Sequence, residues 1–326
     1  MLFSSSTQAQ YTDEINANRP GKSMGGYAVG LGVYQVEAGY SIWSERDKAL
    51  DYSMTGRVYD LSLRGGFWKE ELELLLDLQY QNDKVVWPDD QYQRGGLRQT
   101  YIGAKYLVYD PFKRIPDAKK VNLLSWNANH KFKWRELLPA VSVYAGAHLS
   151  IGSNPYFADQ DKPLSPKVVG ILQNHLGLRY VLVTNLIASK LLTKNFNLGA
   201  IVTLTRGFSD DWSGMVEWQY YSGLAYTDNV IRVGAAYKIH DDLQVDVNMN
   251  RSLKTAPEMM YGGFGLAWRF DDNLGIHWTR VDKKDKKDKN DKKDKKDKKK
   301  KDKKDRKKAD KGVDMPVPTT DTTPKP

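Results

Sequence analysis

Hydrophobic and polar residues alternate with a period of two along most of residues 33–270. Between residues 72 and 81, leucines and Tyr80 occupy the even positions, and Glu, Asp and Gln fill most of the odd ones. A helix would spread these leucines around its surface, whereas a strand places them on one face. The pattern therefore predicts β-strands with one apolar and one polar face.

Eleven such strands can be placed, each of roughly nine to eleven residues, a length that matches a tilted strand crossing a bilayer. They begin near residues 33, 59, 72, 99, 141, 172, 196, 212, 231, 243 and 264. Strands of a soluble sandwich are shorter, about five or six residues. The polar faces carry charges of both signs and so require water, as a solvated exterior or a wet lumen. A transmembrane barrel is favoured over a soluble β-sandwich or a lipocalin-like barrel.

Aromatic residues terminate the apolar faces, as expected of side chains at the two membrane interfaces. These residues are Tyr34, Trp43, Phe67, Tyr80, Trp212, Tyr220, Trp268 and Phe270. The sequence thus predicts an all-β fold, an antiparallel transmembrane β-barrel over residues 24–281.

Single-chain bacterial barrels have an even number of strands, so we expect twelve strands and one that the alternation did not reveal. Three positions are open for it: residues 24–30, residues 274–281, or a division of the long stretch 168–186 near Gly177.

Three segments interrupt the pattern. Residues 82–96 and 152–166 are predicted to be long polar loops on the extracellular side, and residues 239–242 a tight turn. Residues 119–137 mix apolar and basic side chains. A helical insert at the membrane interface, a segment folded into the lumen and a loop helix that covers a sheet edge are all open interpretations.

The net charge of +10 is concentrated near the end of the chain. Residues 282–311 hold 18 Lys, Arg306 and 9 Asp, whereas the chain before Asp282 has 30 basic and 29 acidic side chains. A high isoelectric point alone suggests nucleic-acid binding, but a near-neutral body with a basic tail does not. We expect residues 282–326 to form a disordered Lys/Asp-rich tail, because they have too few apolar residues to build a core.

The sequence contains no Cys, which excludes disulfide scaffolds, Cys-ligated zinc and thiol catalysis. The sequence has no run of about 18 apolar residues, so it predicts no transmembrane helix. Thr7 and Ala9 are small residues spaced as at a signal-peptidase site, so residues 1–9 are interpreted as the remnant of a signal peptide. An ordinary N-terminal segment is the alternative, and residues 10–23 are expected to form a periplasmic segment ahead of the barrel.

Several short motifs occur in a characteristic order. They are Asn-Ala-Asn-Arg-Pro-Gly from residue 16, Ser-Trp-Asn-Ala-Asn-His from residue 125, Gln-Asn-His-Leu-Gly from residue 173 and Tyr-Gly-Gly-Phe-Gly from residue 261. Over residues 16–271 the chain resembles outer-membrane β-barrels of the family described as a "putative MetA-pathway of phenol degradation", also called transporters. The resemblance implies uptake of aromatic or other hydrophobic small molecules and implies no catalytic residue.

Charged and histidine side chains recur on the predicted inner face, where they would line a polar path or pair with one another across the strands. The candidate lumen-lining residues are Glu37, Asp60, Arg64, Glu71, Glu73, Asp77, Lys105, His148, His175, Arg179, Glu217, Arg232, Lys238, Asp246 and Arg269. No catalytic, cofactor-binding or metal site is expected, because no cluster has ligand spacing.

Ser142 and His148 could suggest a barrel hydrolase, since a nucleophilic serine needs an adjacent base. Both are predicted to point into the lumen and no third orienting residue is evident, so we do not expect an enzyme.

The sequence therefore predicts a porin-like transporter in the Gram-negative outer membrane for passive uptake of small molecules. The alternative is a structural or assembly-partner barrel with a filled lumen and a tail that tethers the envelope. Outer-membrane lipid and a small-molecule solute are the expected partners, and nucleic acid is not. The tail is expected on the periplasmic side, where anionic headgroups or peptidoglycan could bind residues 282–311.

Overall fold

The computed structural model describes residues 15–111, 137–150, 154–157, 163–177, 179–223 and 227–271. Four predictions lie outside them: the signal-peptide remnant, nearly all of the 119–137 insert, the strand at 274–281 and the tail. Within the described residues, no helix is long and apolar enough to cross a membrane.

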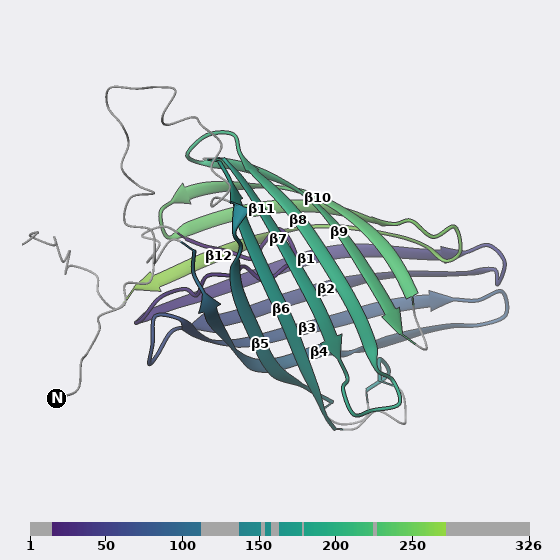
Figure 1. Cartoon of the computed structure of the whole chain (residues 1–326). Helices are drawn as coiled ribbons and strands as arrows, with labels where there is room; N and C mark the ends of the chain where they lie inside the picture. The colour runs from purple at the N-terminus through teal and green to yellow at the C-terminus, as the bar shows by residue number, and fades with distance from the viewer. Residues whose placement is uncertain are drawn as a thin grey trace, which may run out of the picture. The chain divides into compact units, whose positions relative to one another are not determined.

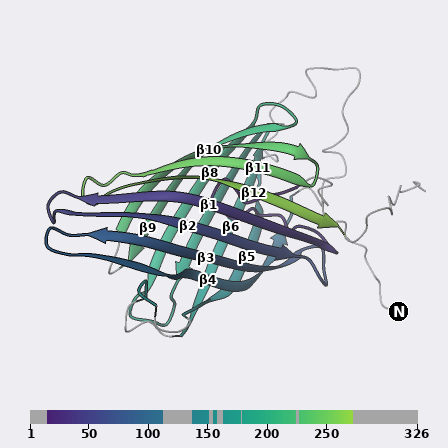
Figure 2. The ribbon, with the colours of Figure 1, turned by 180° about the vertical axis from the view of Figure 1, so that it is seen from behind.

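Twelve antiparallel strands form a closed barrel in which each strand pairs with its neighbours in the sequence and β12 pairs with β1 (Figures 1 and 2). The strands are β1 (Val33–Asp47), β2 (Tyr52–Gly65), β3 (Leu72–Val86), β4 (Gln91–Tyr109), β5 (Ala140–Leu149), β6 (Leu164–Leu176), β7 (Tyr180–Ser189), β8 (Asn197–Gly207), β9 (Trp212–Gly223), β10 (Thr227–His240), β11 (Leu243–Ser252) and β12 (Glu258–Asp271). The predicted all-β antiparallel barrel of twelve strands is confirmed.

The strand that the alternation did not reveal comes from the division of residues 168–186. Leu176 of β6 pairs with Tyr180 of β7, so the chain reverses between them, and Gly177 has a left-handed φ of 73° that favours glycine. Both paired residues occupy even positions, so the alternation continues through the reversal and conceals it.

The two faces of the wall differ as the period of two predicts. On β1, Gln35 and Glu37 are buried inside the barrel, and Ile42 is 60% exposed on the outside. Ile102 of β4 and Leu186 of β7 are likewise about half exposed on the outer face. In a closed barrel the backbone groups pair between neighbouring strands, so none has to be left unpaired in lipid. Together with its apolar exterior, this suits the barrel to a lipid environment.

Aromatic rings form contacts at both ends of this apolar exterior. Near the start of β1, the Tyr34 and Phe67 rings lie 5.4 Å apart; toward the other end, the Tyr59 and Tyr80 rings lie 6.3 Å apart. The prediction for Trp43 is wrong, because this side chain points inward, is buried and donates a hydrogen bond from Nε1 to Asp83.

Strands β1 to β4 are longer than predicted, with 14 to 19 residues each. The predicted loop at 82–96 is mostly strand: β3 continues to Val86, β4 begins at Gln91, and the Trp87 amide donates to the Asp90 carbonyl. The first outward positions of this hairpin, Asn82 and Lys84, are polar, so the apolar alternation did not continue into it. The turn at 239–242 is confirmed, since β10 ends at His240 and β11 begins at Leu243.

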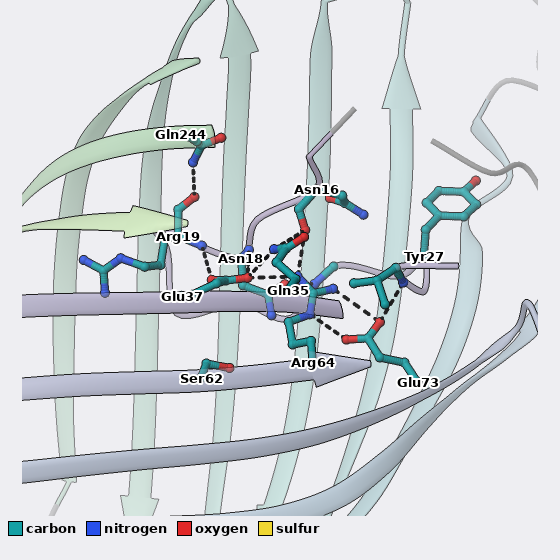
Figure 3. A network of polar contacts seen from close by, with 12 residues as sticks. Asn16, Asn18, Arg19, Tyr27, Gln35, Glu37, Ser62, Arg64, Glu73 and Gln244 are labelled. Carbon is teal, nitrogen blue, oxygen red and sulfur yellow. Dashed lines mark hydrogen bonds and ion pairs between the residues drawn. The ribbon is translucent and has the colours of Figure 1, made fainter. Parts of the chain in front are cut away.

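The segment before β1 runs inside the barrel. The Ile15 amide donates to the carbonyl of Asp241, in the β10–β11 turn, and the following residues contact inward-facing side chains (Figure 3). Gly30 and Gly32, with φ of 102° and 74°, then turn the chain into β1. We call residues 16–29 the lumen segment, and the end of the barrel where β1 begins and β12 ends the near end. The sequence did not predict this placement for residues 16–23.

Candidate functional site

Glu217 of β9 holds the middle of the lumen segment. Its carboxylate accepts hydrogen bonds from the backbone amides of Lys22 (3.0 Å) and Ser23 (3.2 Å) and from the hydroxyl of Thr203 (2.7 Å). The Arg232 guanidinium lies 3.5 Å from it, and the Glu217 side chain is fully buried. One wall carboxylate therefore satisfies two amides that have no strand to pair with.

A chain of ion pairs crosses the inner faces of the first four strands. Arg64 of β2 lies between the carboxylates of Glu37 (3.0 Å) and Glu73 (2.5 Å) (Figure 3). Lys105 lies 3.0 Å from Glu73. All four side chains are buried. Buried charges require such pairing, because an isolated ion in this environment would be strongly unfavourable.

The same ion-pair chain binds the lumen segment. Glu37 accepts hydrogen bonds from the amides of Asn18 and Arg19, each at 3.2 Å (Figure 3). Lys105 donates to the carbonyl of Tyr27 at 2.8 Å. The Val29 amide donates to Glu73 at 3.1 Å. The network is therefore shared between wall and segment.

Arg19 lies against two glycines of the wall. Gly39 and Gly265 face each other across β1 and β12, and a Cβ on either would lie 2.1–2.2 Å from the Arg19 side chain. The guanidinium donates two hydrogen bonds to Asp246 of β11, at 3.0 and 3.1 Å. Pro20 packs in the same way against Gly234, where a Cβ would lie 2.9 Å from its ring. Inward-facing glycines thus make room for the segment.

Amide side chains on β6 and β7 hold the rest of the segment. The Met24 amide donates to Asn185 (2.6 Å), and the Gly26 amide donates to Gln173 (2.7 Å). Lys22 extends its side chain to Asp60 of β2 at 3.0 Å. The segment is thus attached to opposite sides of the lumen.

Two cavities adjoin the lumen segment. The near cavity, about 510 Å³, lies between the segment and the wall of β6 to β9, and includes Tyr27, His175 and Thr205 in its lining. The far cavity, about 350 Å³, lies farther from the near end. Arg19 and Lys22 of the segment line the far cavity, together with Trp43 and Tyr221 of the wall. The described interior is therefore polar and only partly filled.

A second cluster lies at the opposite end of the barrel. Asp83 accepts hydrogen bonds from Trp43 (2.8 Å), Gln81 (2.8 Å) and the hydroxyl of Tyr156 (2.9 Å), and pairs with Arg94 at 3.3 Å. Burial, together with this hydrogen bond to Asp83, raises the pKa of Tyr156 above its usual range, so the hydroxyl remains a donor. Tyr156 belongs to the β5–β6 connection and attaches it to the β3–β4 hairpin.

The predicted lumen-lining residues divide into three groups. Those buried inside the barrel are Glu37, Arg64, Glu73, Lys105, His148, Glu217, Arg232, Asp246 and Arg269. Those partly buried on inward positions are Asp60, Asp77 and His175. Those at the near-end turns are Glu71, the exposed Arg179, and Lys238, which lies 3.4 Å from Asp241.

Ser142 and His148 are both inward, as predicted, but they have different neighbours. The Ser142 hydroxyl donates a hydrogen bond to the Gly26 carbonyl of the lumen segment. The His148 ring lies between those of Tyr101 and Phe157, at 4.9 and 5.0 Å. The geometry assigns Ser142 to holding the segment. Across the described ranges, no group of three or more His, Asp or Glu side chains is placed to hold a metal ion.

Sequence reasoning missed the partners supplied by the lumen segment, chiefly Arg19 and Lys22. One signal was present: Gly39, Gly234 and Gly265 interrupt the inward faces with positions that have no side chain. Small residues facing a lumen indicate that another part of the protein approaches there.

The family model described as "Putative MetA-pathway of phenol degradation" matches residues 17–270. The chain belongs to this family. The match begins within the lumen segment and ends in β12, so it covers the whole barrel. No curated protein sequence matches the chain.

Among solved structures, an outer membrane channel has a similar fold. An outer membrane channel from Pseudomonas putida F1 has 13% sequence identity and a TM-score of 0.51, with 77% of this chain and 99% of the channel covered. The translocator domain of the autotransporter NalP from Neisseria meningitidis has 11% identity and a TM-score of 0.45, with 74% and 89% covered. At 13% identity the similarity to the channel shows the fold alone.

Proposed function

We propose that this protein is an outer-membrane channel for the passive uptake of small molecules. The observation that carries the proposal is a charged, polar lumen with a cavity adjoining the lumen segment on each side. An apolar exterior with aromatic contacts toward both ends supports a membrane location. The family description names phenol degradation, which supports an aromatic or other hydrophobic solute.

In this mechanism the lumen segment is the barrier between the two cavities. Hydrogen bonds to the wall hold the segment in place. A solute passes when these bonds break and the segment shifts within the lumen. The contacts on β9 are few enough to break together: Lys22 and Ser23 share one carboxylate, that of Glu217. Passage is driven only by the solute gradient.

The second candidate function is a structural barrel with a filled lumen. It is favoured by the spread of the segment's contacts over β1 to β11, which would hold the segment permanently. The two candidates differ in whether the segment moves.

A disulfide lock tests this difference. The Ser23 hydroxyl lies 2.8 Å from that of Thr203, and the chain has no Cys of its own. We expect wild-type protein to give current in planar bilayers and swelling of solute-loaded liposomes. The variant S23C/T203C should conduct when reduced and lose current when oxidised, whereas S23C alone should not respond to oxidant. Absence of current and swelling from the wild type, together with current from a variant lacking residues 16–29, would establish the filled barrel instead.

We further propose that the tail lies in the periplasm. The start of β1 and the end of β12 lie at the same end of the barrel, as an even strand number requires. There residues 282–311 would meet anionic headgroups or peptidoglycan carboxylates, to which Lys and Arg are attracted.

A further inference from the structure

The far cavity has an excess of positive charge. Its described lining includes one acidic side chain, Asp60, and five basic ones: Arg19, Lys22, Arg98, Lys167 and Arg232. Three of the five are paired, Arg19 with Asp246, Lys22 with Asp60 and Arg232 with Glu217. Lys167 and Arg98 remain.

Neither Lys167 nor Arg98 has a carboxylate within 4 Å among the described residues. The Lys167 ammonium lies 3.8 Å from the centre of the Tyr101 ring, and Arg98 donates to the side-chain carbonyl of Gln81 at 2.6 Å. Both are on the walls of one cavity, and Arg98 precedes Tyr101 by three residues on β4. A partly enclosed site with two such cations attracts an anion.

The rest of the lining suits a ring. Trp43, Tyr101, Tyr221 and Tyr261 contribute aromatic side chains, and Val58 contributes apolar surface. Amide side chains such as Gln79 and Gln219 lie among them as further hydrogen-bonding groups. The volume, about 350 Å³, is at the small end of the range for ligand sites, roughly 300–1,000 Å³. A ligand with a single ring fits this size.

We propose that the far cavity binds a small organic anion, an aromatic ring bearing a carboxylate, with Lys167 and Arg98 facing the carboxylate and the tyrosine rings facing the ring. This rests on the proposed function in that the cavity would be a station on the solute path. Binding itself does not require passage, so the two can be tested apart.

The experiment measures binding of benzoate to the full chain in detergent by titration calorimetry, with neutral benzamide as the matched probe. We expect benzoate to bind and benzamide to bind at least tenfold more weakly. Lys167→Met and Arg98→Gln should each weaken benzoate binding by about tenfold or more, the loss of one charge-assisted contact. The control is Lys84→Met, because Lys84 is exposed on an outward position of β3. Heat-dependent gel mobility shows that each variant forms the barrel.

Equal binding of benzoate and benzamide, or unchanged affinity in both variants, would overturn the proposal. Displacement of benzoate by phosphate at equal concentration would reduce the site to a general anion site and overturn the role of the rings. A protein that conducts without binding benzoate would refute this site and leave the channel. A protein that binds benzoate but gives neither current nor swelling would keep the site and refute the channel.

Discussion

Replacement of Glu217 by Gln should release the middle of the lumen segment. The substitution preserves the size of the side chain but removes its charge and turns one acceptor oxygen into a donor NH₂. The amides of Lys22 and Ser23, which now donate to one oxygen of the carboxylate at 3.0 and 3.2 Å, would lose their charged acceptor. The substitution would also leave Arg232, 3.5 Å away, with a buried charge and no carboxylate.

The expected magnitude follows from the two amide contacts. Hydrogen bonds to a charged acceptor contribute about 1.5–3 kcal/mol each, so the pair contributes at least about 3 kcal/mol. The lower value applies because two cavities adjoin the segment and water can replace part of the loss. Since about 1.4 kcal/mol corresponds to a factor of ten, amide protection at residues 22 and 23 should fall by roughly 100-fold.

The assay is hydrogen exchange followed by mass spectrometry on peptides covering residues 20–25, together with bilayer conductance. Exchange should accelerate in the segment while the strands stay protected, and conductance should rise. The matched control is Glu258→Gln, whose carboxylate pairs with Arg251 on the surface at 2.8 Å and should matter little. Exchange in the segment equal to that of the wild type would refute the conclusion that Glu217 holds the middle of the segment.

Three further predictions test other parts of the molecule. Gly39→Ala should displace Arg19, since the new Cβ would lie 2.2 Å from the guanidinium, and should raise the conductance. The control Gly170→Ala, whose Cβ would have no atom within 4 Å, should leave the conductance unchanged. Equal currents from the two variants would contradict the role of Gly39. Ile102→Arg should lower the free energy of unfolding of the barrel in liposomes by about 2–4 kcal/mol, measured by urea unfolding. Ile102→Leu is the control, and equal stability of the two variants would argue against lipid contact at this position. Removal of residues 282–326 should leave barrel assembly intact, and failure to assemble would contradict the division of the chain into a barrel and a separate tail. A tail peptide should bind anionic vesicles at low salt and dissociate at high salt.

The alternation of side chains was sufficient to predict the faces of the wall, because each side chain reports the medium that its own face meets. Leu61 and Ile102 face outward, and Glu73 and Lys105 face inward, as their positions predicted. The even strand count followed from barrel closure, although the reversal between Leu176 and Tyr180 could not be located with certainty.

The same reasoning explains what the sequence could not predict about strand length. Apolar alternation ends where a strand leaves the bilayer, but the backbone ladder continues into water, where outward side chains can be polar. Asn82 and Lys84 point outward on such a stretch of β3, which was therefore interpreted as a loop. The alternation therefore indicates the length of the apolar band on each strand and not the full length of the strand.

The sequence by itself determined the barrel, its apolar exterior and its charged interior, because these depend on local alternation and on charge. Only the tertiary structure decided what fills that interior. Arg19 meets Asp246 and Ser23 meets Thr203 across more than 170 residues of chain, and such partners become neighbours only when twelve strands close around the lumen segment. A period of two contains no information about which residues face each other across an enclosed space.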